Sequence, residues 1–239
     1  MFVLPNECMV HQVLDLKRLP LHDMSISERR RFREAVVELE VTAVVRDSLI
    51  PAFVNEQYKV LGIQFISLRL SSLHFAPFVC GVLQKVIKTP AVIYVRDERN
   101  ECYSFALKRL NMQDANQVVV TDEFLTSSLP CGVGKGWGEI VDKYAGFSSS
   151  VNRTTLFSWY VEMMVKCYII TNRTVWSGME KVLSSSVWYN TDAVLELFVD
   201  LKYLVSLTAE RRKSQTMSDS LRLNADLKKL YAKIERAVS

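Results

Sequence analysis

The sequence predicts an α+β fold: a mixed β-sheet with flanking helices in the N-terminal half, and a helical C-terminal half ending in an amphipathic, basic helix. Short runs rich in β-branched and aromatic residues occur before residue 130, whereas apolar residues recur at helical spacing after residue 152. A Gly/Ser-rich stretch separates the two patterns. We therefore expect an α+β domain over residues 1–129, a loop or linker over 130–152 and a helical domain over 153–239.

The first helix is predicted by a capping box. Ser25 and Glu28 have the spacing at which each side chain satisfies a backbone amide of the other, so a helix should begin there. Its early turns carry four arginines, and Phe32 lies at helical spacing for the core. From Leu39 to Val45 the apolar residues alternate with mostly polar ones, which predicts a strand, while a continuation of the helix stays open.

The rest of the first half reads as further strands around a second helix. The run from Val60 to Leu70 predicts a strand, and apolar spacing from Phe78 to Ile87 predicts a helix that stops before Pro90. Two apolar runs, residues 91–96 and 102–109, surround a charged turn and predict a hairpin. Residues 117–121 predict one more strand.

The second half shows three helical segments, over residues 155–171, 191–207 and 223–237. The last one carries a single apolar stripe with charges on either side, and such a stripe needs to be covered. We assign it to partner binding, while docking on this chain's own helix, along Leu195, Phe198, Val199, Lys202 and Val205, stays open. The stripe consists of Leu223, Leu227, Leu230 and Ile234.

The composition is that of an ordinary globular protein. The 239 residues are 49% hydrophobic and 23% charged, which argues against intrinsic disorder. The five cysteines are scattered and form no C-x-x-C pair, so neither a disulfide framework nor a thiolate zinc site is expected. No secretory signal is recognised, and the apolar stretches fall short of the roughly 20 residues of a membrane-spanning helix. We expect a cytoplasmic protein without membrane contact.

Motifs for cofactor binding are incomplete. Gly134-Lys135 resembles the end of a phosphate-binding loop, but Leu129 and Gly136 stand where that motif needs Gly and Ser or Thr. Cys8 and His11 could supply two zinc ligands, yet no second pair follows. We expect no metal and no cofactor. The sequence leaves enzymatic activity undecided and favours its absence.

One arrangement suggests a nuclease of the PD-(D/E)xK type, in which acids or amides and a lysine surround a magnesium ion. Asp47, Gln57 and Lys59 occur in a permissible order near the expected strands. Because patterns this loose arise by chance, the favoured interpretation is a solvated loop after a strand.

Basic residues give a weaker indication of nucleic-acid binding. The formal net charge is only +4, and basic residues on helices usually form solvated faces. Two groups could nevertheless neutralise phosphates, one at the first helix and one in the C-terminal helices. These candidates are Arg29, Arg30, Arg31, Arg33, Arg211, Arg212, Lys213, Lys228 and Lys229.

Several segments resemble a prokaryotic family of unknown function, the domain-of-unknown-function family 4391. They are the opening residues 1–5, the run 60–70, Lys88-Thr89-Pro90 with the following residues 91–94, Ala106-Leu107-Lys108-Arg109, and the tail Arg212-Lys213 with residues 223–230. Gly62 stands where the family often has an acidic residue. The resemblance implies a small protein encoded beside helicase-type ATPases and DNA methyltransferases in restriction and antiphage islands, and it carries over no catalytic residues.

We therefore expect a non-catalytic accessory subunit of such a multi-gene system, which binds a helicase-like ATPase or a DNA methyltransferase. The alternative is a DNA-binding protein or degenerate nuclease of the same system. Direct DNA contact and a homo-oligomer both stay open. A nucleotide or small-molecule sensor is a third class, for which the sequence offers no site.

Overall fold

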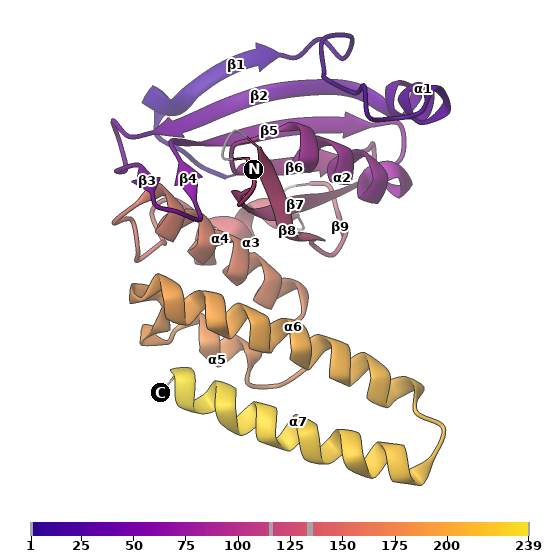
Figure 1. The fold of residues 1–239 in the computed structure, drawn as a ribbon, viewed down its shortest axis with the longest axis vertical. Coiled ribbons are helices and arrows are strands. Elements are labelled where there is room, and N and C mark those ends of the chain that lie inside the picture. Colours follow the sequence, from indigo (N-terminus) through magenta and orange to yellow (C-terminus); the bar gives the residue numbers. More distant parts are fainter. Residues whose placement is uncertain (1, 115–116, 133–135, 239) are drawn as a thin grey trace. The chain divides into compact units, whose positions relative to one another are not determined.

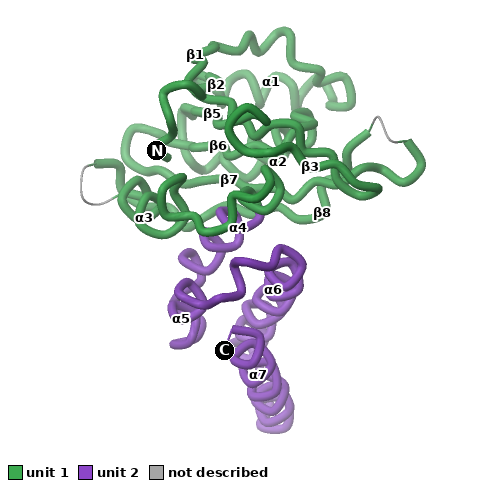
Figure 2. The backbone as a smooth tube through the Cα atoms, turned by 90° about the vertical axis from the view of Figure 1, so that its left-hand side faces the viewer, with its two compact units in different colours: residues 1–160 green, residues 161–239 purple. Residues whose placement is uncertain are grey.

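A computed structural model describes residues 2–114, 117–132 and 136–238. The chain divides into two compact units, residues 1–160 and 161–239 (Figure 2). The division falls within helix α4 (Leu156–Thr171), C-terminal to the Gly/Ser-rich stretch.

Unit 1 is built on a seven-stranded mixed sheet (Figure 1). Its strand order is β1-β2-β5-β6-β7-β8, and β9 pairs with β7. β5 and β6 are parallel, while the other pairs are antiparallel. The strands are β1 (Met9–Val13), β2 (Val36–Arg46), β5 (Gly62–Leu70), β6 (Ala91–Arg96), β7 (Asn100–Leu110), β8 (Val118–Leu125) and β9 (Leu129–Pro130).

The predicted change from helix to strand is confirmed, and it occurs between residues 35 and 36, before the expected strand start at Leu39. Helix α1 (Ile26–Ala35) begins at the predicted capping box, in which the Glu28 amide donates to Ser25 Oγ at 3.3 Å and the Ser25 amide donates to Glu28 Oε2 at 2.8 Å. The chain then enters β2 directly. Its β-branched residues suit the pleated backbone.

The parallel pair is joined by the short 3₁₀ helix η2 (Leu73–Phe75) and helix α2 (Ala76–Val86), as a parallel connection requires (Figure 1). Helices α1 and α2 contribute to one core against the sheet. The core includes Phe32, Ala35, Leu39, Ile66, Leu68, Val79, Leu83, Ile93 and Val95.

The opposite face of the sheet is covered by aromatic residues. Successive strand residues point to opposite faces, so Phe65 and Tyr103 lie away from the α2 core. The Phe2 ring packs edge-on against both, with centroids 5.6 and 5.3 Å away. Trp159 of α4 lies 5.9 Å from Phe65, and Trp137 of helix α3 (Trp137–Tyr144) lies 6.3 Å from Tyr103.

Helix α3 corrects the prediction for residues 130–152. The whole segment was expected to be a loop or linker, but residues 137–144 are helical and Trp137 is only 1% exposed. The indole Nε1 donates to the Ser127 carbonyl at 2.7 Å, which fixes the helix start. Neighbouring glycines hid this helix because glycine is a poor helix former. Residues 133–135, including Gly134-Lys135, lie outside the described residues.

Unit 2 contains the remainder of α4, the short helix α5 (Met179–Leu183), the 3₁₀ helix η3 (Ser186–Tyr189) and two long helices, α6 (Thr191–Lys213) and α7 (Met217–Val238). Helices α6 and α7 form a hairpin with a short turn (Figure 1). Lys233 Nζ donates to Asp200 Oδ1 across it at 2.7 Å. None of the described helices is long and apolar enough to cross a membrane.

The buried face of α6 differs from the predicted one. It consists of Val194, Leu197, Phe198, Leu201, Leu204 and Leu207, whereas Val199 of the predicted face is 59% exposed. Apolar residues follow two overlapping helical stripes in this segment, so spacing alone could not select the buried one.

Candidate functional site

A depression of about 390 Å³ lies at the carboxyl ends of β5 and β6. These strands are parallel neighbours, so their carboxyl ends reach the same edge of the sheet. In open α/β sheets, ligands bind outside such ends. The lining is mainly polar and charged: Val37, Arg69, Leu70, Ser71, Arg96, Asp97, Glu98 and Cys131.

Four charged residues form a row across the sheet at this edge. Glu38 of β2 pairs with Arg69 of β5, Arg69 with Arg96 of β6, and Arg96 with Glu101 of β7. Arg69 Nε lies 3.3 Å from Glu38 Oε2, and both side chains are about half exposed (48% and 46%). Among the described residues, Arg96 has no ion-pair partner.

The Glu101 carboxylate hydrogen-bonds to groups other than Arg96. It is 6% exposed, accepts a hydrogen bond from Tyr94 Oη at 2.5 Å, and accepts another from the Trp137 amide at 2.5 Å. Burial and the nearby Glu101 carboxylate raise the pKa of Tyr94. Glu101 thus anchors the start of α3 and leaves Arg96 facing the depression.

Asp97 holds the rim of the depression in place. Its Oδ2 accepts from the Leu73 amide at 2.9 Å, and its Oδ1 accepts from the Arg99 and Asn100 amides, both at 2.8 Å. Burial acts to raise the pKa of Asp97, but these backbone hydrogen bonds lower it overall. The carboxylate therefore joins the segment after β5 to the β6–β7 turn.

Cys131 lies on the same rim and is partly exposed, while the other four cysteines are buried. Its amide donates to the Arg99 carbonyl at 2.8 Å. Burial and the Glu101 carboxylate raise the pKa of the Cys131 thiol.

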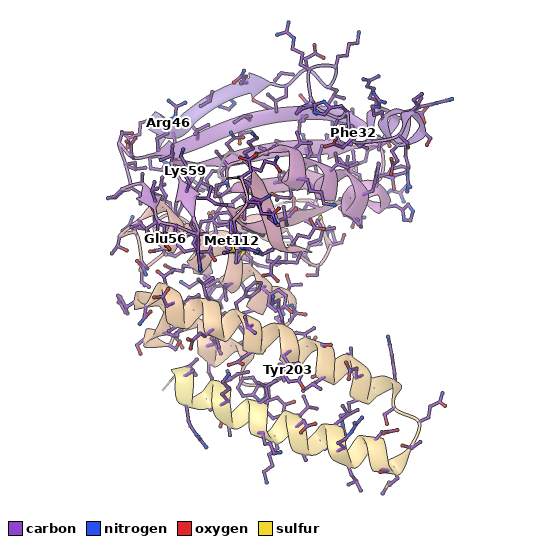
Figure 3. The ribbon with its side chains drawn as sticks, viewed as in Figure 1. Phe32, Arg46, Glu56, Lys59, Met112 and Tyr203 are labelled. Atoms are coloured by element: carbon purple, nitrogen blue, oxygen red, sulfur yellow. The ribbon has the colours of Figure 1, made fainter. Side chains whose placement is uncertain are left out.

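The nuclease candidates occupy a different region. Asp47 lies in the turn after β2, and Gln57 lies between β3 (Phe53–Val54) and β4 (Lys59–Val60). β3 and β4 form a two-stranded ribbon separate from the main sheet, and Lys59 lies on this ribbon (Figure 3). All three side chains are exposed.

The described residues contain no group of three or more His, Cys, Asp or Glu side chains that could hold a metal ion. Cys8 is buried, and His11 Nδ1 lies 3.0 Å from Glu40 Oε1.

Three of the four α1 arginines share one depression, and the fourth lies apart from it. Arg29, Arg30 and Arg33 line a depression of about 360 Å³ together with Ile26 and Glu34. Arg30 is paired with Glu34 at 2.7 Å. Among the described residues, Arg29 Nε is buried without a hydrogen-bond partner. Arg31 instead lies over the Phe78 ring, 4.8 Å from its centroid.

The other basic candidates are in unit 2. Arg211, Arg212 and Lys213 form the exposed last turn of α6, where positive charge is favoured by the helix dipole. Lys228 and Lys229 are exposed on α7, and Lys229 lies 4.0 Å from Asp226.

The four residues assigned to partner binding are buried within the hairpin. Leu223, Leu227, Leu230 and Ile234 are 7%, 5%, 6% and 0% exposed, and α7 packs on α6. A partner could reach them only if the two helices separated. Exposed apolar residues lie on both helices. On α6, Val199 and Tyr203 are 59% and 54% exposed and Leu195 is half-buried one turn earlier, and on α7, Met217 and Leu221 are 80% and 62% exposed. We name Leu195, Val199 and Tyr203 the α6 outer face.

Two of the segments that carried the family resemblance meet in unit 1. Lys108 Nζ donates to the Ile87 carbonyl at 2.7 Å and to the Thr89 carbonyl at 3.0 Å. Burial lowers the pKa of Lys108 to about 7. The Tyr160 hydroxyl lies between β6 and β7. Its Oη accepts from the Ala106 amide at 3.1 Å and lies 3.3 Å from the Ala91 carbonyl oxygen.

Comparison with curated proteins found no match, and neither did comparison with solved structures. A family model described as a domain of unknown function (DUF4391) matches residues 2–234, nearly the whole chain. The chain belongs to the DUF4391 family.

Proposed function

We propose that this protein is a non-catalytic accessory subunit of a multi-gene prokaryotic antiphage defence or restriction system, and that it binds a helicase-like ATPase or a DNA methyltransferase of that system. The system follows from the gene neighbourhood that the family resemblance implies. The α6 outer face supplies the binding surface.

The exposed pair on α6 is the observation that carries the proposal. Val199 and Tyr203 are four residues apart, so they stand on successive turns of one helix face. Tyrosine is among the residues that most often dominate binding energy at protein interfaces. A helix with such a stripe fits a groove on a partner.

The test is co-expression with the helicase-like and methyltransferase proteins encoded beside the gene, followed by affinity measurement on the purified complex. Val199→Glu and Tyr203→Glu should each weaken binding by about tenfold or more, because each puts a charge into a buried contact. The matched control is Leu221→Glu on α7, another exposed apolar position (62%), which should bind normally. Failure of both partners to bind, or equal loss in all three variants, contradicts the proposal.

A DNA-binding role is the second candidate, and Arg29 Nε favours it, since this atom is buried and has no hydrogen-bond partner in the part of the chain that the structure describes. An arginine beside other arginines in a depression is suited to a phosphate oxygen. If this role is right, log affinity for DNA should fall steeply with log salt. Changing Arg29 and Arg33 to Gln should then weaken binding to all DNA sequences alike, and so should Arg211, Arg212 and Lys213 changed to Glu.

The nuclease version of this role has its own test. Magnesium-dependent nicking that disappears in Asp47→Ala and Lys59→Ala would support it. Nicking that both variants retain excludes these residues.

A further inference from the structure

The depression at the β5–β6 edge has features that the accessory role does not use. Arg69 and Arg96 are direct neighbours on adjacent strands, and like charges so placed repel each other. Glu38 offsets this repulsion only in part, because exposed ion pairs are weak. An anion held between the two guanidinium groups would remove it, and paired arginines suit the several oxygens of a phosphate.

The size and lining of the depression indicate which class of ligand it can bind. A volume of about 390 Å³ is within the range of small-molecule sites and exceeds what a lone phosphate fills. Glu98 and Ser71 lie on the same lining and can hydrogen-bond to hydroxyl groups. A ligand with both a phosphate and sugar hydroxyls therefore matches the site better than a bare anion.

We propose that this depression binds a nucleotide, with Arg69 and Arg96 holding its terminal phosphate. The nucleotide is either free or the 5′ end of a DNA strand. Asp97 positions the rim without contacting the ligand, since its oxygens already accept three backbone amides. The site does not depend on the accessory role, which uses residues of unit 2.

Cys131 provides a direct readout of occupancy. It lies on the rim and is the one cysteine of the five that is not buried. A bound nucleotide should slow its modification by a maleimide. The rate is measured on the full-length protein with AMP, ATP, or short single-stranded DNA with and without a 5′ phosphate, alongside calorimetric titration.

We expect Arg69→Gln and Arg96→Gln each to weaken nucleotide binding by about tenfold or more, as loss of a charge-assisted hydrogen bond does. Arg46→Gln is the matched control. Arg46 pairs with Gly62 at the other end of β5, and Figure 3 shows it at the opposite end of the sheet from Phe32 of α1. All three variants change an exposed arginine, and their melting temperatures should stay close to that of the wild type.

The DNA probes distinguish a free nucleotide from the 5′ end of a DNA strand as the ligand. Protection by 5′-phosphorylated DNA but not by 5′-hydroxyl DNA assigns strand ends, and protection by AMP or ATP alone assigns free nucleotides. The proposal is overturned if no phosphate-bearing probe protects Cys131, if 5′-hydroxyl DNA protects as well as phosphorylated DNA, or if Arg69→Gln and Arg96→Gln bind like Arg46→Gln.

Discussion

At the scale of single residues, Lys108 makes the stability of unit 1 depend on pH. Its ammonium is buried against two carbonyls, and burial lowers its pKa from 10.5 to about 7. Between these values the unfolded chain binds the proton that the folded chain has released. The free energy of unfolding should therefore rise with pH from about 7 toward 10.5, and below pH 7 the cost of burying the charge is fully present.

Lys108→Met removes this titration. Denaturant unfolding of both proteins from pH 6 to pH 8.5 should show that wild type gains stability relative to the variant as pH rises. Taking the difference between the two curves cancels the contribution of groups that titrate in both. Parallel curves would mean that Lys108 keeps its ordinary pKa in the folded state.

Glu162 and Lys166 form a buried ion pair on α4. Their side chains are 1% and 5% exposed, their charged atoms lie 2.5 Å apart, and Lys166 Nζ lies 5.1 Å from the Trp188 ring centroid. Lys166→Met should destabilise by about 3–5 kcal/mol, because it leaves a buried carboxylate without its ammonium. The double variant Glu162→Leu/Lys166→Met should recover most of that loss in urea unfolding. A double variant as unstable as the single one would assign the loss to packing instead.

At the scale of elements, the α6–α7 hairpin depends on the buried stripe of α7. Leu227 is 5% exposed and Leu221, on the same helix, is 62% exposed. Leu227→Ala should destabilise by about 2–5 kcal/mol, whereas Leu221→Ala, with the same chemistry, should change stability by less than about 0.5 kcal/mol. Equal effects in thermal unfolding would show that α7 does not pack on α6 through this stripe.

Elements with strong local patterns were predictable. The capping box at Ser25 and the change of period after it located α1 and β2, and the charged turn at residues 97–100 located the β6–β7 hairpin. Strand β1 was missed because all five of its residues are exposed, so no apolar alternation marks it. The candidate site was missed for another reason: Arg69 and Arg96 are far apart in the sequence and meet only through strand pairing.

At the scale of the whole molecule, the placement of the cysteines predicts how many thiols react in the folded protein. Cys8, Cys80, Cys102 and Cys167 are buried, and all five thiols are free. Burial raises the pKa of Cys102 to about 12 and also raises that of Cys80 and Cys167, which suppresses their thiolates in the folded state. Because Cys131 alone of the five thiols is partly exposed, a disulfide reagent should titrate one thiol per native chain, at Cys131, and five in denaturant. Peptide mapping identifies the modified residue, and Cys131→Ser should abolish the native signal while leaving four thiols in denaturant. Rapid titration of further cysteines in the native protein would mean that the core of unit 1 or of unit 2 opens under native conditions. That result would contradict the burial of these four side chains.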